Sequence, residues 1–152
     1  MKIPKPSKKK TNKEKLDKLK ADIDELVRQI LIAQYGYTCQ LSGYGCNCST
    51  DRNKDNHLIV QVNHKITRKV NRLRWDFRNV FLGCKGHNTW AHYNELSWDK
   101  LWRRLTPQDA KYLDLTRHGI MKVNEFTLGA LKTKFERKLK NIKRLSAEGS
   151  VV

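Results

Sequence analysis

Residues 57–88 read HLIVQVNHKITRKVNRLRWDFRNVFLGCKGHN, and the secondary structure of the central part of the chain can be predicted from them. It opens with a short apolar, β-branched run, which predicts a strand over 57–62 that ends at Asn63-His64. A basic loop follows and leads to a second apolar run at 80–82, also a predicted strand. A helical pattern starts at Asn88. The predicted order is therefore strand, basic loop, strand and helix.

Amphipathic helices are predicted on both sides of this stretch. From 13 to 35 apolar residues recur at spacings of 3 and 4, and Gly36 is a suitable stop. Farther along the chain, Ser97, Thr106 and Asn124 are candidate N-caps of three further helices. We therefore expect an α+β fold in which helices flank a small core. The predicted division is a disordered basic tail (1–12), a helix (13–35), the core (36–96), a helical region (97–146) and a flexible end (147–152).

The charge of the chain points to a polyanionic partner. Its 152 residues include 32 lysines and arginines against 15 acids, which gives a formal net charge of +17. Nucleic acid is the first candidate for such a partner. No apolar run approaches the roughly 20 residues of a membrane span, and the N-terminal lysines precede no apolar signal segment. We therefore expect a cytoplasmic protein with no membrane partner.

The cysteines are spaced like metal ligands. Cys84 and His87 can reach one tetrahedral Zn²⁺ from a tight turn. Two more ligands are needed, and a polar loop offers Cys39, Cys46 and Cys48. Cys39 with Cys46 is one choice, and Cys48 is an equal substitute for Cys46. Because this loop is too polar to fold by itself, a structural zinc ion would explain it.

His64 is a candidate general base, because it ends a predicted strand beside the most basic loop of the chain. Phosphodiester hydrolysis also needs a cation at the scissile phosphate. Asn63 and Asn88 carry amide oxygens that suit Mg²⁺ or Mn²⁺. His92 lies four residues after Asn88, so on a helix it would share that face and could join or replace Asn88 as a ligand.

The ordered series Asn63-His64, Asn79 and Cys84-x-x-His87-Asn88 resembles the HNH motif (His-Me finger, ββα-metal) of endonucleases. The stretch 62–88 is similar to the NinG/Rap family of phage recombination endonucleases. That family carries a histidine, a Ser/Thr-Arg pair, an R-[WF]-D-x-x-N segment and a C-x-x-C-N segment in this order. The corresponding residues here are His64, Thr67-Arg68, the segment 74–79 and the segment 84–88. The specific part covers 39–88.

The resemblance implies a role for each matching residue. His64 would be the general base, and Asn79 would orient that histidine or brace the loop. Asn63 and Asn88 would hold the catalytic ion, and Arg68 would clamp the scissile phosphate. The chain departs from the family where Asn63 replaces an aspartate, where Ser42 replaces a cysteine, and where His87 replaces the last structural cysteine. Because a neutral amide binds Mg²⁺ weakly, Mn²⁺ is the alternative catalytic ion.

The expected partner is DNA. Cations of the central loop are predicted to follow the phosphate backbone, namely Lys65, Lys69, Arg72, Arg74, Arg78 and Lys85. The resemblance implies cleavage of branched recombination intermediates, such as Holliday junctions or D-loops, to 5′-phosphate and 3′-hydroxyl ends. The alternatives are a nicking or homing HNH nuclease with sequence preference and a zinc-containing DNA-binding protein that has lost catalysis. A homodimer is also possible.

Overall fold

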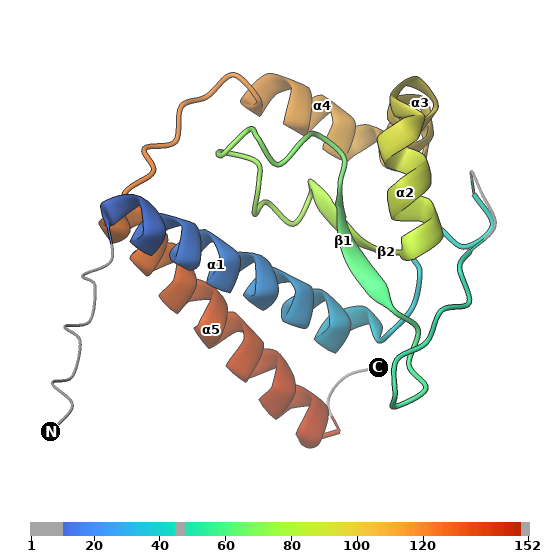
Figure 1. Cartoon of the computed structure of the whole chain (residues 1–152), viewed down its shortest axis with the longest axis horizontal. Coiled ribbons are helices and arrows are strands. Elements are labelled where there is room, and N and C mark those ends of the chain that lie inside the picture. Colours follow the sequence, from blue (N-terminus) through green and yellow to red (C-terminus); the bar gives the residue numbers. More distant parts are fainter. Residues whose placement is uncertain (1–10, 45–47, 150–152) are drawn as a thin grey trace, which may run out of the picture.

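Figure 1 shows the computed structural model, which describes residues 11–44 and 48–149. This part of the chain is α+β, as predicted, with five helices and one two-stranded antiparallel sheet. None of these helices is long and apolar enough to cross a membrane. The elements are α1 (Asn12–Tyr35), β1 (Val60–His64), β2 (Val80–Cys84), α2 (Lys85–Tyr93), α3 (Glu95–Leu105), α4 (Pro107–Thr116) and α5 (Glu125–Ala147).

The small sheet is covered on both faces. β1 and β2 pair so that His64, which ends β1, lies opposite Val80, which begins β2. Successive residues of a strand point to opposite faces. Val80 and Leu82 accordingly join the core formed with α1 and α5, whereas Phe81 joins a second core formed with α3 and α4. Helix α2 follows β2 without a loop, so the predicted strand–strand–helix order is present.

Helices α1 and α5 lie side by side along one edge of the molecule (Figure 1). Two ion pairs show that the helices run parallel: Lys15 pairs with Glu125 near both N-termini, and Asp22 pairs with Lys132 further along. The second pair is the closer one, at 2.8 Å between Lys132 Nζ and Asp22 Oδ2. Their apolar faces form most of the first core, with Ile23, Val27, Ile30, Leu31, Leu128, Phe135 and Leu139 buried.

The ends of the outer helices differ slightly from the prediction. Thr11 and Glu14 form a reciprocal capping box, so α1 begins at Asn12 and the last two residues of the predicted tail belong to the helix and its cap. The rest of that tail, residues 1–10, lies outside the described residues, as do 150–152 of the predicted flexible end. Asn124 caps α5 as predicted, by accepting a hydrogen bond from the Thr127 N–H.

Elements around the sheet also begin at other residues than predicted. β1 starts at Val60 rather than at 57, because Leu58 pairs with Arg52 in an isolated bridge before the strand. Helix α2 starts at Lys85 rather than Asn88, because Cys84 caps it. Helix α3 starts at Glu95, so the predicted boundary between 96 and 97 falls inside a helix.

Candidate functional site

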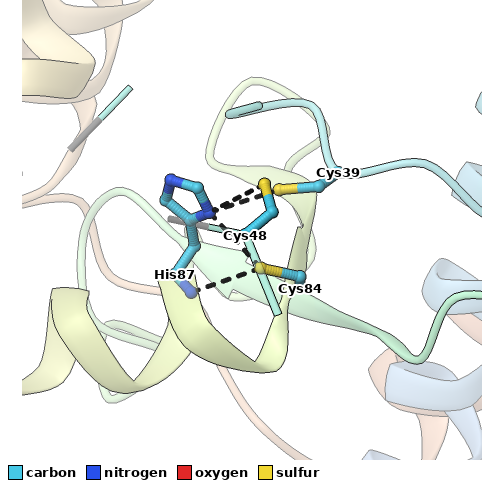
Figure 2. A group of neighbouring side chains, drawn as sticks. All are labelled: Cys39, Cys48, Cys84 and His87. Atoms are coloured by element: carbon cyan, nitrogen blue, oxygen red, sulfur yellow. Dashed lines mark hydrogen bonds between the residues drawn. The ribbon is translucent and has the colours of Figure 1, made fainter. Parts of the chain in front are cut away.

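Three cysteines and one histidine converge beside the sheet (Figure 2). Cys39 lies in the turns after α1, Cys48 in the following loop, Cys84 at the end of β2 and His87 in the first turn of α2. The His87 Nδ1 atom lies 3.4 Å from the sulfur of Cys39, 3.6 Å from that of Cys48 and 3.4 Å from that of Cys84. All four ligand atoms lie within 4.8 Å of one another. These residues, here called the Cys₃His cluster, are positioned to bind a metal ion.

Hydrogen bonds around the Cys₃His cluster prepare it for a cation. The His87 Nε2–H donates to the carbonyl oxygen of Tyr44, so Nδ1 is the unprotonated nitrogen that faces the sulfurs. Burial opposes ionisation of the Cys84 thiol, but N–H groups of His87 and Ser49 donate to its sulfur and lower its pKa to about 7. Burial raises the pKa of Cys39 to about 12.

The Cys₃His cluster confirms part of the prediction about which residues could bind a metal ion. Cys39, Cys84 and His87, which were predicted to be ligands of one ion, lie together in the cluster. The choice between the two remaining cysteines could not be made from spacing, and the structure brings Cys48 to the cluster. Cys46, the other candidate, lies outside the described residues.

A cavity of about 520 Å³ opens where the end of β1 meets α2 and α3, and is here called the helix-side cavity. Asn63, His64, Asn88 and His92 all line it. Asn88 and His92 share one face of α2, as their spacing predicted. Asn63 belongs to β1 and is only 2% exposed, yet neither its Nδ2 nor its Oδ1 has a hydrogen-bond partner among the described residues. A buried amide without partners is costly and indicates a missing ligand such as an ion or water.

His64 lies between the helix-side cavity and a second cavity. Its Nε2–H donates to the Arg74 carbonyl oxygen at 3.0 Å. The neutral ring therefore has an unprotonated Nδ1, which makes no hydrogen bond among the described residues. Burial lowers the pKa of His64 below its usual value, against an opposing effect of that hydrogen bond and of Asp24. Near neutral pH the ring is therefore mainly neutral and able to accept a proton.

Asn79 braces the loop over 65–79 from inside. It is fully buried, and its Oδ1 accepts a hydrogen bond from the Ile66 N–H at 2.7 Å. Its Nδ2 donates to the carbonyl oxygens of Ile66 and Leu73, at 2.9 Å each. Of the two roles predicted for Asn79, these contacts correspond to bracing the loop.

We expect Asn79→Ala to lower the free energy of unfolding by about 2–4 kcal/mol, because three buried backbone groups lose their partner. Urea unfolding followed by circular dichroism measures this loss. Asn71→Ala is the control, since Asn71 lies in the same loop and its side chain makes no hydrogen bond among the described residues; we expect a change within about 0.5 kcal/mol. Equal midpoints for the two variants would contradict the bracing role.

Two of the predicted DNA-contacting cations are engaged inside the protein. Lys65 Nζ lies 2.7 Å from the Asp109 carboxylate, and only 7% of the lysine side chain is exposed. Arg74 forms two hydrogen bonds with Asp24. These partners lie 44 and 50 residues away, so sequence spacing gave no sign of them. Lys65 and Arg74 are therefore structural ion-pair residues in this fold.

The other predicted cations remain at the surface. Arg68 is exposed and lines the second cavity, of about 680 Å³, together with His64 and Arg74. The Arg78 guanidinium lies 3.7 Å above the Tyr112 ring, which fixes its direction. The remaining exposed cations of this set are Lys69, Arg72 and Lys85, of which Lys85 pairs loosely with Asp51 at 3.6 Å.

Sequence reasoning missed the α3 side of the helix-side cavity. Glu95, Asp99 and Arg103 line it from α3, and Arg117 lines it from the residue after α4. None stands in a recognisable motif. The one feature of the sequence that could have indicated them is the polar pair Asn94-Glu95, where α2 ends and α3 begins.

Comparisons of the chain with protein-family models, with curated proteins and with solved structures found no match.

Proposed function

We propose that this protein is a metal-dependent DNA endonuclease of the HNH type. The observation that carries the proposal is the lining of the helix-side cavity, to which His64, Asn63, Asn88 and His92 all contribute from a strand–strand–helix unit. A candidate base and three candidate metal ligands thus border one open space. This grouping favours hydrolysis over simple binding, because a binding surface needs no buried amide without a partner.

In this proposal His64 is the general base. A water molecule attacks the phosphorus atom, and its proton passes to the free Nδ1 of His64. The bond from phosphorus to the 3′-oxygen breaks, and that oxygen takes up a proton, which leaves a 5′-phosphate and a 3′-hydroxyl end. Arg68, next to His64 at the second cavity, is the cation for the scissile phosphate.

Asn63, Asn88 and His92 would hold the catalytic Mg²⁺ or Mn²⁺. The fit of Asn63 rests on its buried amide, whose oxygen has no hydrogen-bond partner among the described residues. When bound, such an ion stabilises negative charge on the phosphate and on the leaving oxygen.

Zinc is the metal that we propose for the Cys₃His cluster. In a tetrahedral site, Zn–S bonds of about 2.3 Å and a Zn–N bond of about 2.0 Å separate sulfur and nitrogen by about 3.5 Å. The three observed separations, 3.4, 3.6 and 3.4 Å, agree with this value. The ion would be structural, because four protein ligands leave no position open for a substrate.

DNA is the proposed substrate, on the strength of the +17 charge and of the exposed cations beside His64. Further cations with no ion-pair partner among the described residues lie exposed on α5, namely Lys134, Arg137, Lys140 and Lys143. Contacts from several elements suit a branched duplex, such as a recombination junction, in the cytoplasm of a host cell. A homodimer would present two active sites to such a junction.

The test uses the zinc-loaded protein with a labelled four-way junction and a linear duplex of the same sequence, each with Mg²⁺, Mn²⁺ or EDTA. We expect metal-dependent cleavage of the junction and slower cleavage of the duplex. Equal cleavage at one sequence in both substrates would favour a nicking or homing nuclease. Binding without cleavage in both metals would overturn the enzyme and leave a zinc-containing DNA-binding protein.

A further inference from the structure

The α3 side of the helix-side cavity carries two carboxylates, Glu95 and Asp99. Helix α2 ends and α3 begins at Asn94, whose Nδ2 donates back to the Trp90 carbonyl oxygen. This break turns the chain, so that the first residue of α3 faces the same cavity as His92 near the end of α2. Both helices lie on the side of the sheet away from α1 and α5 (Figure 1).

The two carboxylates differ in their partners. Both oxygens of Asp99 accept hydrogen bonds from Arg103 Nε, at 2.9 and 2.8 Å, so its charge is already balanced. The Glu95 carboxylate has no hydrogen bond or ion pair with any described residue, and Glu95 is exposed at the cavity. Glu95 is therefore the free negative charge on the lining of this cavity.

The proposed cation site needs such a charge. Its three ligands are two amides and an imidazole, all neutral, and the cations that line the same cavity, Lys65, Arg103 and Arg117, are each paired with an aspartate. Hard divalent cations bind in proteins mainly through carboxylate oxygens, so a set of neutral ligands alone would hold one poorly. The buried amide of Asn63 lacks a hydrogen-bond partner among the described residues, and this favours a ligand at this end of the cavity.

We propose that Glu95 completes this site and supplies its anionic ligand for Mg²⁺ or Mn²⁺. The inference rests on the proposed function, because it concerns the same ion. With Glu95 as a ligand, the cation site is built from residues of β1, α2 and α3, and the strand–strand–helix unit alone would not complete it.

Binding of Mn²⁺ to the zinc-loaded protein without DNA tests the role of Glu95. Free Mn²⁺ gives a six-line paramagnetic resonance signal that disappears on binding, so the dissociation constant is read without any cleavage. We expect Glu95→Gln to weaken Mn²⁺ binding by at least about tenfold and Glu95→Asp to retain most of the affinity. Glu136→Gln, an equal charge change on the exposed surface of α5, should bind like the wild type.

The outcomes separate the two proposals. Wild-type affinity in Glu95→Gln would overturn the role of Glu95 and leave the proposed nuclease intact. If the zinc-loaded wild-type protein binds no Mn²⁺, the proposed cation site itself would be overturned. Circular dichroism of Glu95→Gln checks folding, and loss of affinity in a folded Glu95→Gln with recovery in Glu95→Asp would support the carboxylate ligand.

Discussion

Replacement of His64 by glutamine is expected to slow DNA cleavage by about 10²- to 10⁴-fold, while DNA binding stays within about threefold of the wild type. The reason is chemical. The glutamine amide can still donate to the Arg74 carbonyl oxygen, as His64 Nε2 does, but it has no nitrogen able to accept a proton. Single-turnover cleavage of a labelled junction at saturating protein measures the loss, and a gel-shift titration measures binding.

His118→Gln is the matched control for this experiment. His118 is exposed and does not line the helix-side cavity, so we expect wild-type cleavage from that variant. Cleavage at the wild-type rate by a folded His64→Gln protein would remove the proposed base and with it the proposed mechanism. A parallel loss of binding and cleavage would assign His64 a structural role instead.

Loss of the Cys₃His cluster is expected to have the largest effect on stability. Cys84→Ser should abolish binding of one zinc ion per chain and unfold the loops that carry Cys39 and Cys48. Serine can still cap α2, so the substitution removes the metal ligand with little change to the helix. Structural zinc contributes about 10–16 kcal/mol of binding free energy in small domains, which exceeds the stability of most domains. Metal analysis and thermal unfolding, with and without a strong chelator, measure both effects.

The same measurements decide between the two loop cysteines. We expect Cys48→Ser to lose the zinc ion and Cys46→Ser to keep it, because Cys48 already completes four ligands with Cys39, Cys84 and His87. The reverse pattern would make Cys46 the ligand. Full stability of Cys84→Ser in chelator would show that the cluster holds no metal that the fold requires.

Local sequence patterns predicted the elements near the site well. The β-branched run before Asn63 and the apolar run before Cys84 are strands, and the four-residue spacing of Asn88 and His92 puts both on one helix face. These predictions succeed because period and propensity act over a few residues. Cys84 and His87 could likewise be predicted as a pair of ligands, because they lie within one helical turn of each other.

Long-range contacts explain what the sequence could not predict. Lys65 and Arg74 look like surface cations, but Asp109 and Asp24 neutralise them across the fold. Glu95 looks like an ordinary first-turn acid, and only the break at Asn94 brings it to the cavity of His92. Such contacts follow from how helices pack, and no local pattern encodes them.

The parallel pairing of α1 with α5 bears on how the chain is made. Asp22 and Lys132 meet although 110 positions separate them, and Phe135 and Leu139 close the core around Ile30. A ribosome therefore releases the apolar side of α1 well before the α5 residues that complete its cover exist. Until synthesis has passed Leu139, the part of that side that α5 covers is open to solvent and to association with other nascent chains. The first core can consequently be completed only late in translation, after the strands and the Cys₃His cluster have been made.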